Sequence, residues 1–207
     1  VTAFTALSMV PFSGDGFSVF GYEVRWVISD VNIGILMILA IGSLSTYAIV
    51  LGGWSSNSKY PLLGAMRAAA QMVSYEVALA FAVLSGLMVA GSLNMSKIVE
   101  AQLEMGVWFV FVQPVAFVVF LIAMIAETNR LPFDLPECET ELVAGYHTEY
   151  SSMKFALFFL GEYAAMIIGS GIAVTLFLGG WSLPFGWLAP ESVDAPVVWW
   201  QGLIHMG

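Results

Sequence analysis

The sequence predicts an all-α protein, a multipass bundle of transmembrane helices. Of its 207 residues, 59% are hydrophobic and only 10% are charged, and the mean hydropathy is +0.88. Soluble domains carry about 25% charged residues, so this composition is typical of a membrane protein. The apolar residues also gather in long runs, and a transmembrane helix needs about 20 of them in succession. Both observations favour a single integral membrane domain over residues 1–207.

Four apolar runs are long enough to form complete transmembrane helices. The first ends in Leu51-Gly-Gly-Trp54 and the last in Leu178-Gly-Gly-Trp181, which is typical of glycine stops followed by a tryptophan at the membrane interface. The predicted helices cover about residues 31–53, 65–91, 107–127 and 153–179.

Two further apolar stretches predict partial helices, at 1–12 and 195–207, so we expect this chain to be an internal fragment of a longer protein. Polar connections are predicted between the complete helices, at 54–64, 92–106 and 128–152.

The connection at 128–152 is a dense acidic loop in a chain where charge is scarce. Arg130, Arg67, Lys59 and Lys154 lie at the ends of the helices that flank this loop and the 54–64 connection, whereas the opposite ends hold only Arg25 and Lys97. The positive-inside rule therefore predicts that the loop is cytoplasmic. The acidic residues of the loop are Asp134, Glu137, Glu139, Glu141 and Glu149.

Three further glutamates lie inside the predicted helices. Glu76 and Glu162 follow the cytoplasmic starts of their helices, and Glu127 precedes the cytoplasmic end of its own. At 1.5 Å per residue Glu162 lies roughly 14 Å deep, near the middle of a hydrocarbon core of ~30 Å. An ionisable side chain at such depth costs a few kcal/mol and marks a functional site by default. A buried carboxyl group also titrates nearer to neutral pH than one in water, so we expect a proton relay.

A structural role is the alternative for each of these acids. Glu162 could be a neutral carboxyl group held by hydrogen bonds, Glu76 a polar packing site, and Glu127 an acid that reaches water. Arg67 shares a helical ridge with Gln71 and Tyr75, and could pair with loop carboxylates or serve only as a positive-inside anchor.

Small residues recur every fourth position on two helices, which favours close helix packing and predicts a contact between these two helices. These residues are Ala78, Ala82, Gly86 and Ala90 on one helix, and Gly161, Ala165, Gly169 and Ala173 on the other.

Several classes of protein are excluded by the sequence. The net charge of −9 argues against binding to nucleic acid. The single cysteine, Cys138, excludes a disulfide within this chain and alone makes no metal site. No phosphate-binding, redox or zinc motif occurs, so we expect this chain to bind no cofactor or metal. From the residues alone, the prediction is a proton-handling membrane subunit with an acidic cytoplasmic chamber.

The acidic loop and its flanking motifs resemble one family closely. Over residues 28–181 the chain is similar to the H subunit of proton-pumping NADH:quinone oxidoreductase, respiratory complex I. The motifs that carry the resemblance are Gly53-Trp-Ser-Ser-Asn-Ser-Lys-Tyr-Pro-Leu-Leu-Gly-Ala-Met-Arg67, Ser74-Tyr-Glu76, Ala126-Glu-Thr-Asn-Arg130, Pro132-Phe-Asp-Leu-Pro-Glu137, Glu141-Leu-Val-Ala-Gly-Tyr-His-Thr-Glu-Tyr-Ser151 and Gly161-Glu-Tyr163.

The resemblance implies a subunit of about eight helices in the inner membrane of a cell or mitochondrion. Such a subunit joins the membrane arm to the peripheral arm, forms much of the quinone chamber and couples quinone reduction to proton translocation. Quinone would be the substrate, and FMN and iron–sulfur clusters would lie in partner subunits. The implied proton path is Glu76, Glu127 and Glu162. The implied chamber and coupling residues are Arg67, Arg130, Asp134, Glu137, Glu139 and Glu141.

One departure and two alternatives accompany the resemblance. Some members of the family carry a further glutamate where this chain has Ser43. The anchor subunit of a membrane-bound hydrogenase or formate hydrogenlyase is related and reduces no quinone. A free-standing transporter or proton channel would also need buried acids. The match across the whole loop at 126–151 favours quinone oxidoreductase over both.

Overall fold

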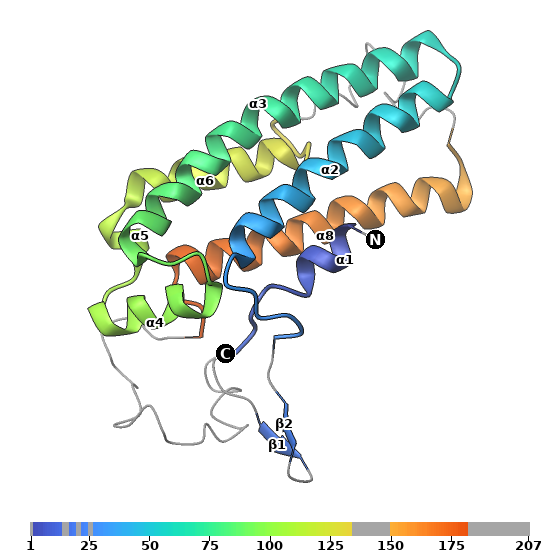
Figure 1. Cartoon of the computed structure of the whole chain (residues 1–207). Coiled ribbons are helices and arrows are strands. Elements are labelled where there is room, and N and C mark those ends of the chain that lie inside the picture. Colours follow the sequence, from blue (N-terminus) through green and yellow to red (C-terminus); the bar gives the residue numbers. More distant parts are fainter. Residues whose placement is uncertain (1, 14–16, 20–21, 25–26, 134–149, 182–207) are drawn as a thin grey trace.

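Four helices run side by side along the long axis of the molecule (Figure 1). The computed structural model describes residues 2–13, 17–19, 22–24, 27–133 and 150–181. Three helices are long and apolar enough to cross a membrane, and a fourth apolar helix is shorter. The predicted all-α membrane bundle is thereby confirmed. The four are α2 (Gly34–Ser55), α3 (Lys59–Ala90), α6 (Pro114–Glu127) and α8 (Ser152–Phe177).

Shorter elements complete the fold around this bundle. The helix α1 (Thr2–Leu7) packs against α2 and α8. A small antiparallel hairpin lies outside the bundle, with Ser18 opposite Glu23 (Figure 1). Its strands are β1 (Phe17–Val19) and β2 (Tyr22–Val24). Two further helices connect α3 to α6, α4 (Met95–Met105) and α5 (Phe109–Val112).

The helix α3 begins earlier than the sequence analysis predicted. We expected a connection over 54–64, yet α3 begins at Lys59, after Ser58 in an extended conformation. Proline is tolerated in the first turn of a helix, where its missing N–H has no partner to lose, so Pro61 does not delay the start. At the other end, Gly91 adopts a left-handed conformation (φ 67°) and its N–H donates to the Leu87 carbonyl. Glycine accepts this conformation without strain, which is why the helix stops there.

The predicted helix over 107–127 is wrong as a single element. The structure divides it into α5 and α6, with the break at Gln113 (φ −133°, ψ 62°) and Pro114. Proline lacks a backbone N–H and disfavours the helical conformation of the preceding residue, so one helix ends and the next begins with Pro114. The Gln113 side chain ties this break to α3, donating from Nε2 to the Ser85 carbonyl at 3.1 Å.

The segment predicted as a polar connection over 92–106 contains the helix α4. Asn94 caps its start, since Oδ1 accepts hydrogen bonds from the Ser96 and Lys97 N–H groups at 2.9 and 3.2 Å. The buried residues of α4 follow the i, i+3, i+4, i+7 spacing of one helical face. Eleven residues are too few to cross a membrane, so a search for long apolar runs overlooks this amphipathic helix. Its buried residues are Met95, Ile98, Val99 and Gln102.

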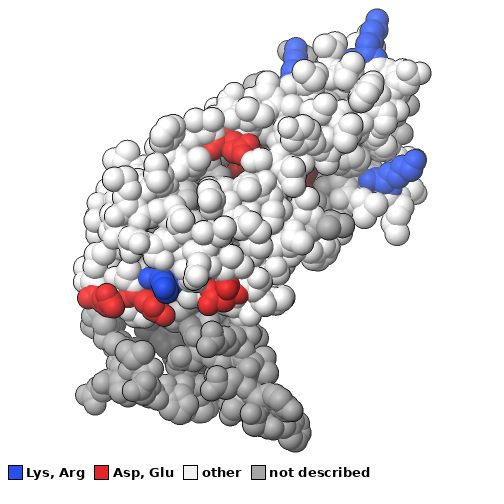
Figure 2. Space-filling model, viewed as in Figure 1, with Lys and Arg blue, Asp and Glu red and all other residues white. Residues whose placement is uncertain are grey.

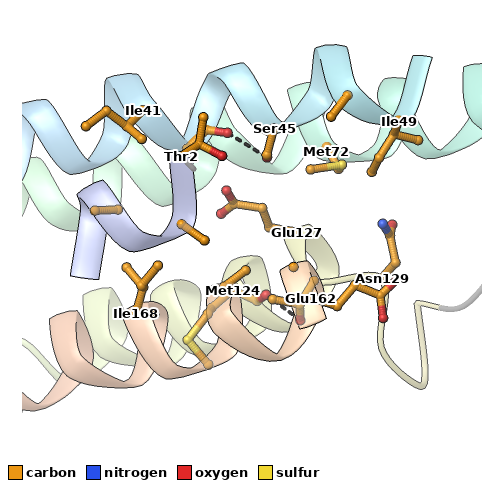
Figure 3. Close-up of a pocket in the computed structure, with 18 of the residues that line it drawn as sticks. Thr2, Ile41, Ser45, Ile49, Met72, Met124, Glu127, Asn129, Glu162 and Ile168 are labelled. Carbon is orange, nitrogen blue, oxygen red and sulfur yellow. Dashed lines mark hydrogen bonds between the residues drawn. The ribbon is translucent and has the colours of Figure 1, made fainter. Parts of the chain in front are cut away.

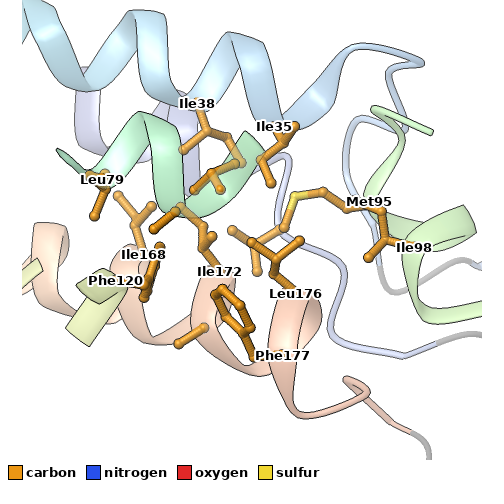
Figure 4. Packing of buried hydrophobic residues seen from close by; sticks show 14 of the residues in the cluster. Ile35, Ile38, Leu79, Met95, Ile98, Phe120, Ile168, Ile172, Leu176 and Phe177 are labelled. Atoms are coloured by element: carbon orange, nitrogen blue, oxygen red, sulfur yellow. The ribbon is translucent and has the colours of Figure 1, made fainter. Parts of the chain in front are cut away.

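The hydrophobic core joins α2, α3, α4, α6 and α8 (Figure 4). Phe177 of α8 is fully buried, and its ring lies 5.5 Å from the Phe120 ring of α6 and 5.4 Å from that of Phe117. Aromatic pairs at this separation add to the stabilisation from burial alone. The core thereby fixes the separation of the helices that carry the predicted glutamates.

The small residues of α3 and α8 do bring helices close together, but with different partners. A Cβ at Gly86 would lie 2.9 Å from Leu176 Cδ1 on α8, whereas a Cβ at Gly169 would lie 2.6 Å from Met124 Sδ on α6. Gly161 has no such neighbour within 4 Å. The two predicted ridges therefore do not form one continuous α3–α8 seam.

Charged side chains gather at the two ends of the bundle (Figure 2). In that view, one end shows Lys and Arg side chains, and the opposite end of the described surface shows a cation beside several acids. Lys59 stands at the first residue of α3 and Lys154 in the first turn of α8, while α4 carries Lys97 among Glu100 and Glu104. Because α3 and α8 begin at the same end of the bundle, the cations at their starts would lie on the same side of a membrane that the bundle spans.

Candidate functional site

A cavity of about 490 Å³ lies within the bundle, and all three predicted glutamates line it. Figure 3 labels two of them, Glu127 and Glu162. Its wall combines residues of α1, α2, α3, α6 and α8. Most of them are apolar, among them Ile38, Leu79 and Phe120, which also belong to the hydrophobic core. In the space-filling view, acidic side chains lie in a hollow partway along the otherwise uncharged bundle (Figure 2). Acids that are separate in sequence therefore share one largely apolar chamber.

Glu76 comes from the middle of α3 and is half-buried. Its Oε1 accepts a hydrogen bond from the Ser43 hydroxyl of α2. A hydrogen bond donated to a charged carboxylate is stronger than one between neutral groups. The neighbouring helix therefore supplies Glu76 with a donor that nothing in the spacing of the sequence predicted.

Glu127 is the last residue of α6, and Figure 3 shows its side chain extending into the space between α2 and α8. A Cβ at Gly42 of α2 would lie 3.8 Å from Glu127 Oε1, so the carboxyl group reaches the surface of that helix. Glu127 is also close enough to Glu76 for the two charges to repel each other. Two carboxyl groups from different helices thus face the short segment Gly42–Ser43.

Glu162 projects from α8, and its side chain is only 15% exposed. Its Oε2 lies 3.8 Å from Nη2 of Arg130, a residue of the turn that follows α6. The Arg130 guanidinium also lies over the Tyr163 ring, with Cζ 4.9 Å from its centroid. The Arg130 Nε is buried, and no residue in the described parts of the chain accepts a hydrogen bond from it. This ion pair links the start of the acidic loop to the cavity.

The side chains of α3 hold the start of the acidic loop in place. Gln71 Nε2 lies within hydrogen-bond distance of the Ala126 carbonyl at 2.7 Å, the Phe133 carbonyl at 2.9 Å and Asn129 Oδ1 at 3.1 Å. One turn further along α3, the Tyr75 ring packs edge-on against Phe133 with centroids 5.3 Å apart. Gln71 and Tyr75 were recognised from the sequence as neighbours on one ridge, and the structure shows what this ridge contacts.

The other end of the loop is held by α2. The Tyr150 hydroxyl donates to the Gly52 carbonyl at 2.8 Å and lies 2.6 Å from Ser55 Oγ. Its ring packs on Phe158 of α8, with centroids 5.2 Å apart. Since Phe133 and Tyr150 are both fixed, the acidic loop leaves and re-enters the bundle beside the cavity, which Tyr150 itself lines.

The remaining predicted site residues lie apart from the cavity or outside the described residues. Arg67 lies on the exposed face of α3 and does not line the cavity, whereas Lys154 of α8, which the sequence analysis treated only as a topology signal, does line it. A polar side chain such as Gln71 in an apolar helix was the available signal for the loop anchor. The loop acids Asp134, Glu137, Glu139 and Glu141 lie outside the described residues.

The sequence matches a family model described as NADH dehydrogenase over residues 1–205. Among curated relatives, it is 50% identical over 210 residues to an H subunit of NADH-quinone oxidoreductase from Solibacter usitatus, covering 98% of this chain and 51% of that protein. It is 50% identical over 190 residues to an H subunit of the same enzyme from Geobacter metallireducens, covering 92% and 56%. It is 51% identical over 187 residues to the H subunit from Rhodospirillum rubrum, covering 90% and 53%.

The chain spans about half the length of these curated relatives. The matched region includes the whole described bundle and the residues that line its cavity. The chain therefore belongs to the NADH dehydrogenase family.

Proposed function

We propose that this chain is part of the membrane subunit of a proton-pumping NADH:quinone oxidoreductase. The observation that carries the proposal is the cavity in which Glu76, Glu127 and Glu162 meet. Holding three carboxyl groups from three helices in a largely apolar space costs free energy, and ionisable groups in such surroundings are by default functional. The curated relatives are named as subunits of NADH-quinone oxidoreductase, which supports this enzyme class for the proposal.

The cavity glutamates would pass protons from the cytoplasmic side into the membrane. A carboxyl group in apolar surroundings exchanges its proton near neutral pH, which a relay requires. Repulsion between Glu76 and Glu127 disfavours the state in which both are charged, so a proton gained by one favours release by the other. Lys154, which lines the cavity, and Arg130, which faces Glu162, supply positive charge at the loop side of this cavity.

The acidic loop would form part of the quinone chamber and couple quinone reduction to the relay. Reduction of a quinone takes up protons and changes the charge nearby. Arg130 stands at the start of this loop and faces Glu162, so a charge change in the loop has a direct route to the cavity. Arg67 does not line the cavity, and in this proposal it would pair with carboxylates of the loop. The proposed loop acids are Asp134, Glu137, Glu139 and Glu141.

Electrons would arrive from other subunits, since the sequence has no redox motif of its own. FMN and iron–sulfur clusters would belong to peripheral-arm partners, with further membrane-arm subunits receiving the protons. Inner-membrane location, in a cell or a mitochondrion, follows from the same proposal. Purification of the complete complex tests it directly. Flavin and iron–sulfur subunits that oxidise NADH should co-purify, whereas co-purification of a hydrogenase or formate dehydrogenase would contradict it.

The proton role is tested with Glu127→Gln in the complete complex. Glutamine keeps the size and polarity of the side chain but cannot ionise, so the complex should assemble and lose most of its coupled activity. NADH:quinone reduction and proton uptake are measured together in inverted membrane vesicles. Glu104→Gln is the matched control, because Glu104 is exposed on α4 and does not line the cavity. Proton uptake at the normal rate in Glu127→Gln would show that the Glu127 carboxyl group takes no part in proton transfer.

A further inference from the structure

The Ser43 hydroxyl lies within reach of two acceptors of different kinds. Its Oγ lies 3.1 Å from the Leu39 carbonyl, one turn earlier in α2, and it also contacts Glu76 Oε1 on α3. Ser43 and Glu76 are both half-buried. One acceptor is a backbone carbonyl with a constant charge, and the other is a carboxyl group that can change its charge.

A serine hydroxyl has one hydrogen to donate and two lone pairs to accept with. When Glu76 is ionised, the hydrogen of Ser43 is best donated to the carboxylate, because bonds to a charged acceptor are the stronger ones. When Glu76 is protonated, its own O–H can donate to Ser43 Oγ, and the Ser43 hydrogen turns to the Leu39 carbonyl. The hydrogen bond between Ser43 and Glu76 is then kept in both states, with no movement larger than a rotation about the Ser43 C–O bond.

We propose that Ser43 is a positioning residue for Glu76, whose hydroxyl turns between the Glu76 carboxylate and the Leu39 carbonyl as Glu76 loses and gains its proton. The inference rests on the proposed function of Glu76 in the relay. Ser43 itself transfers no proton in this scheme. It holds the carboxyl group in one place in both protonation states and lowers the cost of switching between them.

The surroundings of Glu76 show why its position matters. Gly42, the residue before Ser43, faces Glu127, so the same turn of α2 is in contact with two carboxyl groups. The titratable groups that line the cavity with Glu76 are Glu127 from α6, Glu162 and Lys154 from α8, and Tyr150. A Glu76 side chain that rotates away from Ser43 would change its distance from Glu127. In this proposal the hydroxyl of Ser43 therefore fixes the position of the Glu76 carboxyl group relative to that of Glu127.

Ser43→Thr and Ser43→Val form a matched pair for the test, because they have nearly the same shape and differ by one hydroxyl group. In a helix, the Thr hydroxyl can bond to the carbonyl one turn earlier, as Ser43 does. In inverted vesicles that contain the complete complex, Ser43→Thr should keep proton uptake close to the unmodified level. Ser43→Val should lower it about tenfold, the scale expected for a lost hydrogen bond to a charged group.

The pH profile of proton uptake separates positioning from simple packing. Without its donor, the charged form of Glu76 is less stable, so the profile of Ser43→Val should move to higher pH while that of Ser43→Thr stays in place. Ser43→Ala removes only the oxygen and repeats the measurement if the methyl groups of valine prevent assembly. Ser170→Ala is the control, since the exposed Ser170 hydroxyl bonds to the Met166 carbonyl of its own helix, at 2.8 Å.

Glu76→Gln distinguishes failure of this inference from failure of the proposed function. Normal proton uptake in Glu76→Gln would contradict the function proposed for Glu76, and the role of Ser43 would fall with it. A large loss in Glu76→Gln, together with equal rates and equal pH profiles in Ser43→Thr and Ser43→Val, would overturn only the role of Ser43. A loss and a shifted profile in Ser43→Val alone would support both.

Discussion

The three cavity glutamates have different surroundings at the scale of single residues. Glu76 accepts a hydrogen bond from Ser43, Glu162 faces Arg130, and Glu127 extends toward the bare surface of α2 at Gly42. Position in the sequence identified the acids, because charge inside an apolar run is rare and costly. It could not identify their partners, because each partner comes from another helix or from a turn.

Glu162 should be needed in its ionisable form. Glu162→Gln is expected to assemble and to lose most coupled activity, on the scale of about 100-fold for a missing proton-transferring group. Glu162→Asp keeps the carboxyl group but places it further from Arg130, so its activity should fall between the two. Quinone reduction and proton uptake in membranes from both variants decide this. The exposed Glu100 of α4 provides the control as Glu100→Gln. Proton pumping at the normal rate by Glu162→Gln would show that Glu162 has only a structural role in packing.

Turns and helix contacts decide how the acidic loop is attached at the scale of structural elements. The turn after α6 is held by Gln71 and Tyr75 of α3, and the segment before α8 is held by α2 through Tyr150. Gln71 and Tyr75 lie well inside α3 and Tyr150 lies just before α8, so only the arrangement of the helices tells which segment each side chain meets.

Replacing Gln71 with leucine should loosen the start of the loop. The Phe133 carbonyl and the Asn129 side chain would lose their shared donor, which costs about 1–3 kcal/mol of local stability. Backbone hydrogen exchange over 129–133 should accelerate in the purified complex, and quinone reduction should fall. Ser74→Ala is the control on the same helix, since the exposed Ser74 hydroxyl bonds to the Ala70 carbonyl of its own helix. Unchanged exchange in Gln71→Leu would show that Tyr75 and Phe133 suffice to anchor the loop.

The contact between α2 and α3 should depend on the missing side chain of Gly53. A Cβ there would lie 2.3 Å from Ala65 Cβ and 2.8 Å from the Pro61 carbonyl oxygen, and neither atom belongs to a flexible side-chain end. Gly53→Ala is therefore expected to destabilise the protein by about 1–3 kcal/mol. Gly161→Ala in α8 is the matched control, because a Cβ there meets nothing within 4 Å. Thermal unfolding of the two variants compares them, and equal midpoints would contradict this account of the packing.

At the scale of the whole molecule, the described bundle provides a chamber lined by acids, and the sequence contains no redox motif. The cavity wall is built from several helices that are separate in the sequence, and it is lined by three acids and by residues of the hydrophobic core. The chain is also only about half as long as its curated relatives. Activity is accordingly expected of an assembly rather than of this chain.

The isolated chain should therefore show no NADH or quinone reductase activity. Electrons would have to come from an iron–sulfur cluster of a partner, and the sequence contains no motif that would bind one. Purified in detergent, the chain should have no visible absorbance beyond that of its aromatic residues in the ultraviolet. Absorbance from a flavin, a haem or a cluster that remains after extensive washing would refute this prediction.

The fold class and the cavity acids could be predicted from the sequence, because both depend on local composition. Long apolar runs predict membrane helices, and Glu76, Glu127 and Glu162 are conspicuous inside them. The helix predictions were wrong where a short local feature mattered more than the length of an apolar run. Pro114 divides a run that is apolar throughout, and the short amphipathic helix α4 is too polar and too brief to resemble a membrane span.

Only the tertiary structure decided which of these residues meet. Helical spacing determines which residues share a face of their own helix, but the contact between Ser43 and Glu76 joins positions 33 residues apart on two helices. The hydrogen bond between Tyr150 and Gly52 joins positions 98 residues apart. Such pairs depend on how the helices pack, and packing is determined by the fit of many side chains at once. The sequence thus determines which residues are acids inside apolar helices. The packing of Phe120, Phe177 and the glycines between the helices determines which residues these acids contact.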